Sequence, residues 1–224
     1  MRVAIIPVRG GSKRIPGKNG RSFMGRPLLE YPINACHKSG LFDHILVSTD
    51  DEKLAKLARG CGAEVPFMRP ERLAGDHVPT APVVEHALDW IKKNWGAPEQ
   101  YCQLYANPFI RSVNLRAAHK ILKDSGAREV LAVTEFPYPI LRAFKLTDDG
   151  VEYAFPEYKL TRSQDLPLFY HDAAQFYWHN PDFVLPKSLP FVLPRNQVVD
   201  IDTEEDWRIA EQLYRVLELE EDDR

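Results

Sequence analysis

The sequence has few cysteines and little imbalance of charge, and each shortage excludes a class of protein. Three cysteines lie far apart among 224 residues. With no CxxC pair and no neighbouring histidine, they predict neither a disulfide framework nor a zinc site. Twenty-nine basic side chains face thirty-two acidic ones, and the net charge of −3 provides no global field to attract nucleic acid or an anionic membrane. Any anion that the protein binds must be held by a local cluster.

A long apolar run is also missing from the start of the chain. The first residues, MRVAIIPV, contain an apolar run too short for a membrane span or for the core of a signal peptide. We therefore expect a cytoplasmic protein with no membrane partner. A length of 224 residues and an apolar content of 44% are sufficient for one large α/β domain.

Apolar runs of strand length alternate with segments of helical period along most of the chain. Strands are predicted at residues 3–8, 44–50, 64–67, 101–105, 129–135, 174–179 and 197–202. Helices are predicted at 27–40, 51–62, 83–95, 113–126 and 203–219, the last beginning at a capping-box-like pair, Thr203 and Asp206. Crossovers between parallel strands need covering helices. The sequence thus predicts an α/β fold with a Rossmann-like, mostly parallel sheet sandwiched by helices.

The rhythm changes at about residue 137 to short alternating stretches with many aromatic residues and prolines. A small β-rich insertion is predicted over residues 137–170 of an otherwise single domain, residues 1–224. Exposed aromatic side chains are unfavourable on a monomer, so a homodimer through this insertion is expected. The alternative is that they cover the open end of the sheet. These side chains are Phe136, Tyr138, Phe144, Tyr153, Phe155 and Tyr158.

A glycine-rich cationic loop, RGGSKRIPGKN at residues 9–19, follows the first predicted strand. Four basic side chains gather there around three glycines. Glycines let backbone N–H groups approach an anion without obstruction by Cβ, and the cations attract it. The loop follows a strand and so lies at the carboxyl edge of the sheet, where open α/β proteins bind ligands. A polyphosphate fits these properties, and a solvated basic turn is the alternative.

Spacing excludes the two most familiar phosphate-binding loops. A P-loop has four residues between its first glycine and a Gly-Lys pair that Ser or Thr follows. Here Gly11 and Gly17 bracket five residues, and Asn19 follows Lys18. The dinucleotide fingerprint G-x-G-x-x-G is missing as well. The loop therefore belongs to another nucleotide-binding fold.

The run at residues 9–19 resembles the N-terminal signature of the cytidylyltransferases that activate sialic-type nine-carbon sugar acids, and the resemblance covers nearly the whole chain. Members of that family transfer CMP from CTP to the anomeric hydroxyl of the sugar acid and release pyrophosphate. The resemblance implies a fold of the nucleotide-diphospho-sugar transferase type, with Lys18 near the α-phosphate. The nucleotide contacts that it implies in the loop are Arg9, Gly10, Gly11, Ser12, Lys13, Lys18 and Asn19.

Asp200 and Asp202 lie two positions apart in a predicted strand, so both carboxylates are expected on one face, where they could share a hard cation. Alone, this pattern is weak, because alternating surface carboxylates are common. In the resembled family DIDT followed by a helix recurs, and its two aspartates bind magnesium. The resemblance thus implies Mg²⁺ on Asp200 and Asp202. Asp202, Lys18 and Arg9 are the residues expected to stabilise charge on the α-phosphate.

Two further runs resemble segments of the family. RPERLAGDHVPT places Arg69 and Thr80 where members contact the base and ribose, although each residue alone would be interpreted as a surface arginine and a helix cap. RSQDLPLFYHDAAQFYWH looks like the pseudaminic-acid branch, with Ala174 where glycine is usual. It implies that the sugar or nucleotide pocket is lined by Gln164, His171, Asp172 and Gln175.

Two other runs leave alternatives open. QLYANPFIR departs from the usual family run, so Gln103, Tyr105 and Asn107 are candidate sugar contacts that could instead only shape a strand end. In VSTD, Ser48 or Asp50 is predicted to cap the helix that follows. No side-chain pair identifies a general base.

These observations favour a Mg²⁺-dependent cytidylyltransferase for CTP and a nonulosonic acid, with pseudaminic acid as the leading substrate. Sialic acid, legionaminic acid and the eight-carbon acid of a related synthetase group are alternatives. A D-x-D glycosyltransferase is a second class, but it would not need a dense cationic loop for a triphosphate. A silent nucleotide-binding module is a third, and it would be expected to lack a metal aspartate or Lys18.

Overall fold

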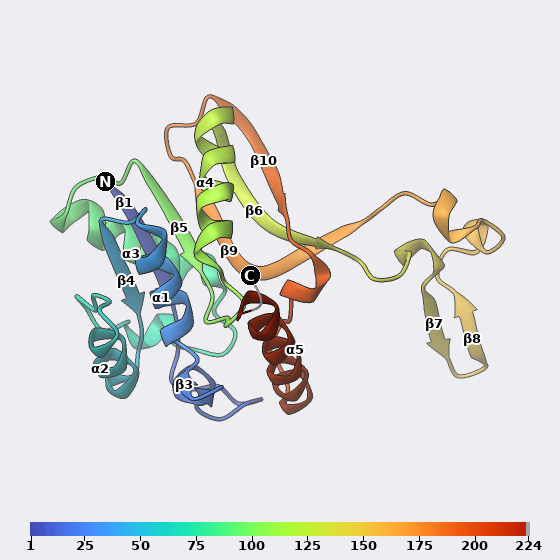
Figure 1. Ribbon diagram of the computed structural model, residues 1–224, viewed down its shortest axis with the longest axis horizontal. Helices are drawn as coiled ribbons and strands as arrows, with labels where there is room; N and C mark the ends of the chain where they lie inside the picture. The colour runs from blue at the N-terminus through green and yellow to red at the C-terminus, as the bar shows by residue number, and fades with distance from the viewer. Residues whose placement is uncertain (223–224) are drawn as a thin grey trace.

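The computed structural model describes residues 1–222, which are built around a six-stranded sheet of order β10-β6-β9-β5-β1-β4 (Figure 1). β9 runs antiparallel to β5 and β6, whereas the other three pairings are parallel. The predicted mostly parallel sheet is confirmed. Its strands are β1 (Arg2–Pro7), β4 (His44–Ser48), β5 (Gln100–Leu104), β6 (Ala127–Glu135), β9 (Tyr170–His179) and β10 (Leu185–Val192).

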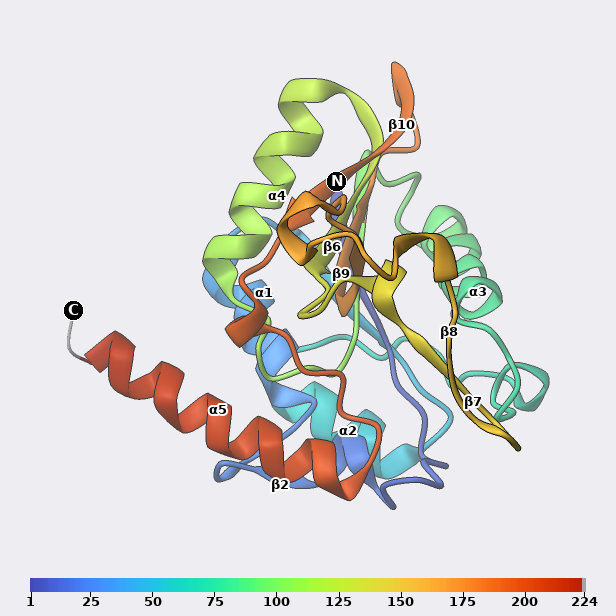
Figure 2. The same cartoon turned by 90° about the vertical axis from the view of Figure 1, so that its right-hand side faces the viewer.

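Helices cover both faces of the sheet because both faces of its central strands are apolar. In β1, Ala4 and Ile6 belong to one apolar cluster with α1 (Glu30–Ser39), α2 (Glu52–Gly60) and α4 (Ser112–Ser125). Val3 and Ile5 point the other way, into a cluster with α3 (Thr80–Asn94). Figure 2 shows α3 on the opposite side of the sheet from α1 and α4. Each fully buried isoleucine contributes about 1.5–3 kcal/mol relative to an exposed one.

Helix ends follow local sequence. Gly40 and Gly126, at the ends of α1 and α4, adopt the left-handed conformation with φ of 64° and 63°. The side chain of Asp51 caps α2 by accepting a hydrogen bond from Leu54 N at 2.9 Å. The prediction that Ser48 or Asp50 caps this helix is therefore wrong by one residue.

Two predicted strands do not form, and one strand of the six-stranded sheet was missed. Within residues 64–67 only Glu64 pairs with β4, through an isolated bridge to Leu46. In the predicted strand at 197–202, Gln197 is the last residue of a short 3-10 helix, η6 (Arg195–Gln197), and residues 198–202 belong to no strand. The missed strand is β10, whose Pro186 and Pro190 argue against a strand on sequence grounds. β10 lies at the edge of the sheet, where proline is tolerated because its missing N–H faces no partner strand.

The segment after the cationic loop packs with the last helix. It contains η1 (Lys18–Gly20), β2 (Ser22–Phe23) and β3 (Arg26–Pro27). Phe23 and Trp207, the latter in α5 (Glu204–Asp222), make an edge-to-face contact with ring centroids 5.5 Å apart. The predicted capping box is confirmed, since Thr203 N donates to Asp206 at 2.8 Å and Asp206 N donates to Thr203 Oγ1 at 3.2 Å.

Residues 136–169 leave the sheet after β6 and return at β9. They contain a two-stranded hairpin, β7 (Phe144–Thr147) and β8 (Gly150–Tyr153), which projects from the sheet (Figure 1). Tyr138 and Leu160 are 81% and 88% exposed. Within residues 1–222, every helix is too short or too polar to span a bilayer. The remaining 3-10 turns are η2 (Glu71–Leu73), η3 (Ile140–Arg142), η4 (Pro156–Tyr158) and η5 (Ser163–Asp165).

Candidate functional site

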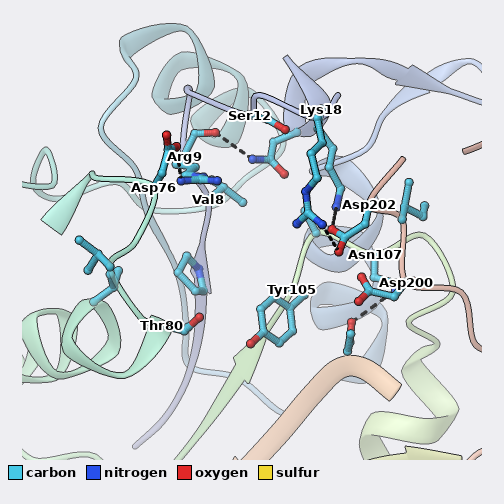
Figure 3. Close-up of a pocket in the computed structure, with 18 of the residues that line it drawn as sticks. Val8, Arg9, Ser12, Lys18, Asp76, Thr80, Tyr105, Asn107, Asp200 and Asp202 are labelled. Carbon is cyan, nitrogen blue, oxygen red and sulfur yellow. Dashed lines mark hydrogen bonds and ion pairs between the residues drawn. The ribbon is translucent and has the colours of Figure 1, made fainter. Parts of the chain in front are cut away.

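A cavity of about 740 Å³ opens where β1 and β5 end (Figure 3). Five parts of the chain form its walls: the end of β1 with the cationic loop, residues 69–83, residues 105–107, residues 172–177 of β9 and residues 200–202. The carboxyl ends of parallel strands meet at this edge, so the fold brings together residues as far apart in sequence as Arg9 and Asp202. The expected nucleotide contacts Arg9, Ser12, Lys13, Lys18, Asn19, Arg69 and Thr80 all line this cavity.

Two loop cations are paired with an acid that sequence reasoning missed. Arg9 Nη1 lies 2.7 Å from Asp76 Oδ1, and Lys13 contacts the other oxygen of the same carboxylate. The hydrogen bond from Lys13 and the charges of both cations hold the pKa of Asp76 below its usual range. Asp76 lies in the run RPERLAGDHVPT, but only the three-dimensional structure reveals a pairing across 67 residues. Asp76 is thus paired with two of the cations expected to meet phosphate.

The two predicted metal aspartates lie beside the other end of the loop. Arg14 Nη1 is 2.7 Å from Asp202 Oδ2, and Lys18 Nζ is 4.0 Å from Asp202 Oδ1. Burial lowers the pKa of Lys18, while the charges of Asp202 and Asp200 oppose that shift. Burial, followed by the charge of Asp202, raises the pKa of Asp200. Arg14 was not expected in the site, although its place in the cationic loop was the available signal.

Gly10 and Asn19 shape the loop. Gly10 N donates to Asp50 Oδ1 at 3.1 Å, and Asn19 Nδ2 donates to the carbonyl of Arg9 at 2.9 Å. A Cβ on Gly10 would lie 2.8 Å from Asp51 Cβ, so only glycine fits without displacement of a neighbour. A Cβ on Gly11 would meet nothing within 4 Å. Neither glycine is among the residues that line the cavity.

Arg69 is not the surface arginine that its sequence context alone suggested. It is 8% exposed, and Nη2 donates to the carbonyl of Val8 at 2.8 Å and to that of Ser48. These bonds tie the residue after β1 to the end of β4 and support the root of the loop. Thr80 begins α3 after Pro79 at the cap position.

The expected sugar contacts separate into two groups. Tyr105 and Asp172 line the cavity with Tyr177, whose hydroxyl donates to Asp172. Burial and this hydrogen bond raise the pKa of Tyr177 well above its usual value. Ala174 N also donates to Asp172, at 2.8 Å. Ala174 has a φ of 50°, a conformation that glycine adopts without strain, which explains the glycine usual in the resembled branch.

Four other expected contacts, Gln103, Gln164, His171 and Gln175, do not line the cavity. Gln175 is fully buried beneath it, and Gln103 is 9% exposed. His171 packs against Phe136 with ring centroids 4.8 Å apart. Gln164 lies in η5, outside the sheet.

The cavity offers two carboxylates to a divalent cation. Among the described residues, no group of three or more His, Cys, Asp or Glu side chains is placed to hold a metal. Mg²⁺ is commonly bound by one or two carboxylates, with phosphate oxygens and water completing its coordination. Asp200 and Asp202 therefore fit a magnesium ion that a nucleotide would share. Burial and the charge of Asp202 raise the pKa of Asp200, and a bound cation would offset both effects.

Comparisons with known proteins agree with this geometry. A sequence model of a family described as cytidylyltransferase matches residues 3–206. The chain is 42% identical over 224 residues to the pseudaminic acid cytidylyltransferase of Campylobacter jejuni, which covers 96% of each chain. It is 30% identical to the CMP-N,N′-diacetyllegionaminic acid synthase of Legionella pneumophila, again over 96% of each chain. The solved structure of a CMP:2-keto-3-deoxy-manno-octonic acid synthetase complexed with CTP superposes with a TM-score of 0.70 at 15% identity, over 96% of this chain and 98% of that one. The predicted fold type is thereby confirmed.

Proposed function

The chain belongs to the cytidylyltransferase family, and on that premise we propose that it transfers CMP from CTP to a nine-carbon 2-keto sugar acid, with pseudaminic acid as the leading substrate. The anomeric oxygen attacks the α-phosphorus, the bond from the α-phosphorus to the bridging oxygen breaks, and pyrophosphate leaves. The hydroxyl proton passes to solvent. One observation carries the proposal: a single cavity joins the cationic loop to Asp200 and Asp202. The identity to the Campylobacter enzyme supports the choice of sugar.

The loop is proposed to bind the triphosphate by an exchange of partners. Arg9 and Lys13 now contact Asp76, and a phosphate chain in the cavity would take its place on both cations. Charged hydrogen bonds to phosphate are among the stronger polar contacts in proteins. Lys18, which is 21% exposed, is proposed to lie at the α-phosphate, where a partly buried cation acts with less screening than at the surface.

Asp200 and Asp202 are proposed to hold Mg²⁺ at the phosphates. When bound, the ion would offset negative charge that builds on the phosphoryl oxygens. Asp202 would then leave Arg14, which at present lies 2.7 Å away. Release would make the guanidinium of Arg14 available to the leaving pyrophosphate.

The sugar acid is proposed to occupy the end of the cavity near Tyr105 and Asp172. Asp76 and Asp202 each form an ion pair with an arginine of the cationic loop. Asp172 differs, because it accepts hydrogen bonds from two neutral donors, the Tyr177 hydroxyl and Ala174 N. A carboxylate in that setting suits the N–H or O–H groups of an acylamino sugar and would repel the acid group of the sugar.

We further propose that residues 137–170 form a dimerisation subdomain. Large apolar side chains support this role, among them Leu146 at 86% exposed and Leu168 at 64%. Sedimentation velocity at micromolar concentration tests it, and a clean monomer would contradict the interface.

The proposed use of CTP as a substrate supports the expected cytoplasmic location.

A pyrophosphate-release panel tests the proposed function. CTP, ATP, GTP and UTP are each paired with pseudaminic, legionaminic, N-acetylneuraminic and eight-carbon keto sugar acids in the presence of Mg²⁺. We expect release with CTP alone, fastest with pseudaminic acid. Release without a sugar acid, or an equal rate with all four nucleotides, would contradict the assignment. Binding of CTP without turnover would instead indicate a silent nucleotide-binding module.

A further inference from the structure

Residues 199–202 carry the two proposed metal carboxylates without support from the sheet. Among the described residues, none of their N–H or C=O groups forms a backbone–backbone hydrogen bond. Ile201 anchors the segment by its side chain, which is 2% exposed in the apolar cluster with Trp207. On the α5 side, Asp202 N donates to Asp206 Oδ2 at 3.1 Å. A different device must hold the residues that precede Asp200.

That device consists of two buried side-chain amides. Asn107, which is 4% exposed, donates from Nδ2 to the carbonyl of Val199 at 3.0 Å, while its Oδ1 accepts from Phe109 N at 2.9 Å. Gln175, which is fully buried, donates from Nε2 to the carbonyl of Gln197 at 2.6 Å. A carbonyl only accepts, so these bonds fix the orientation of both amides. Figure 3 shows Asn107 beside Asp200 and Asp202.

The side-chain amide of Gln175 has a hydrogen-bond partner for its nitrogen but not for its oxygen. Its Oε1 is buried and meets no hydrogen-bond partner among the described residues. A buried acceptor without a donor is unfavourable, and an apolar side chain of the same shape would avoid that penalty. Stability alone therefore does not explain a glutamine here. Among the described residues, the hydrogen bond that its side chain makes is the one to the carbonyl of Gln197. The side chain of Gln197 in turn accepts a hydrogen bond from Asn114 Nδ2 at 3.1 Å.

We propose that Asn107 and Gln175 are positioning residues that fix residues 197–199, so that Asp200 and Asp202 meet at the cavity in one geometry. The inference rests on the proposed function, because it assigns these amides to the site for metal and nucleotide. It replaces the sugar contact expected of Gln175, whose amide lies beneath the cavity wall and faces the connection to α5. Small displacements of catalytic groups reduce rates steeply, so loss of either amide should reduce the rate by displacing Asp200 and Asp202.

The test compares Gln175→Met, which keeps the length and removes the donor, with Asn107→Ser, which cannot reach Val199. Thr134→Val is the matched control, because Thr134 is 2% exposed and donates to a backbone carbonyl, Leu193 O, at 2.9 Å. Two quantities are measured on the full chain: the Mg²⁺ concentration for half-maximal pyrophosphate release, and the rise in Tm that Mg²⁺ produces at fixed CTP without sugar acid.

We expect Gln175→Met and Asn107→Ser to raise the half-saturating Mg²⁺ concentration about 10-fold or more and to reduce the Mg²⁺-dependent rise in Tm. Gln175→Met should keep the ligand-free Tm near that of the wild type, and Thr134→Val should leave both magnesium responses unchanged. A wild-type magnesium response in Gln175→Met, with a raised KM for the sugar acid, would overturn the inference and restore the direct sugar contact. If the wild-type chain shows no turnover, the proposed function fails separately, and the magnesium-dependent Tm decides on the two amides.

Discussion

Gly10→Ala tests how closely the cationic loop is fitted to the helix behind it. The added Cβ would lie 2.7 Å from Asp51 Oδ2 and 2.8 Å from Asp51 Cβ. Rotation of Asp51 could move its oxygen but not its Cβ, so the loop or the start of α2 must shift. Loss of the Asp51 cap would cost about 1 kcal/mol, and retained overpacking about 1–3 kcal/mol. We expect the free energy of unfolding to fall by about 2 kcal/mol, which lowers Tm by roughly 4–8 °C in a chain of this size.

The shift should also reduce activity, because Gly10 adjoins Arg9 and its N–H holds the loop to Asp50. Pyrophosphate release should show kcat/KM for CTP reduced by at least ~10-fold, as expected for misplaced binding groups. Gly11→Ala is the control, since its Cβ would have open space. In an Asp51→Gly background, Gly10→Ala should add little further loss, because the clashing atoms are gone. Equal damage from Gly11→Ala, or a wild-type Tm for Gly10→Ala, would refute this reasoning.

Four other changes probe the site and the fold. Asp202→Asn should lower kcat about 100-fold and weaken the dependence on Mg²⁺, and near-normal rates in a magnesium titration would exclude its metal role. Lys18→Ala should reduce kcat more than it raises KM for CTP, whereas a change in KM alone would assign Lys18 to ground-state binding. Asp76→Asn should lower KM for CTP, because Arg9 and Lys13 lose the carboxylate that competes with phosphate; a raised KM would show that Asp76 instead organises the loop. Burial lowers the pKa of His119 and His179 in the folded chain. Below about pH 6.5 the unfolded chain therefore binds more protons than the folded chain, so the free energy of unfolding should decrease as the pH is lowered. Urea titrations at several pH values measure this slope, which His119→Gln should reduce.

The order of helices and most strands could be predicted because it depends on local periodicity. Residues 44–50, 51–62 and 113–126 became β4, α2 and α4 with small changes at their ends. Residues 64–67 have the composition of a strand, yet whether an edge segment pairs depends on how its neighbours twist and end. β10 was missed because Pro186 and Pro190 are compatible with a strand only at an edge, and position in the sheet is not a local property.

In the candidate site, too, the features that depend on local sequence could be predicted and those that depend on long-range contacts could not. The cationic loop and the two aspartates were visible as local patterns, and the structure brings Lys18 and Asp202 to one cavity. The partners of those groups were not visible, because each contact joins distant parts of the chain. Asp76 pairs with Arg9, and Arg69 is buried against Val8, across 67 and 61 residues. Such pairings depend on the order of the strands in the sheet, which local patterns in a single sequence do not determine.

The ends of the projecting segment lie next to each other, which makes the segment separable in principle. Glu135 is paired with Tyr170, and Phe136 N donates to the carbonyl of Phe169 at 3.0 Å. β6 and β9 thus form an antiparallel hairpin, and residues 136–169 are the long connection between its two strands. Since the entropy of closing a loop grows only with the logarithm of its length, the sheet should form almost as readily around a short turn or a foreign cassette. The segment could thus be transplanted between relatives as one piece, while the edge of the sheet that carries the cavity stays unchanged.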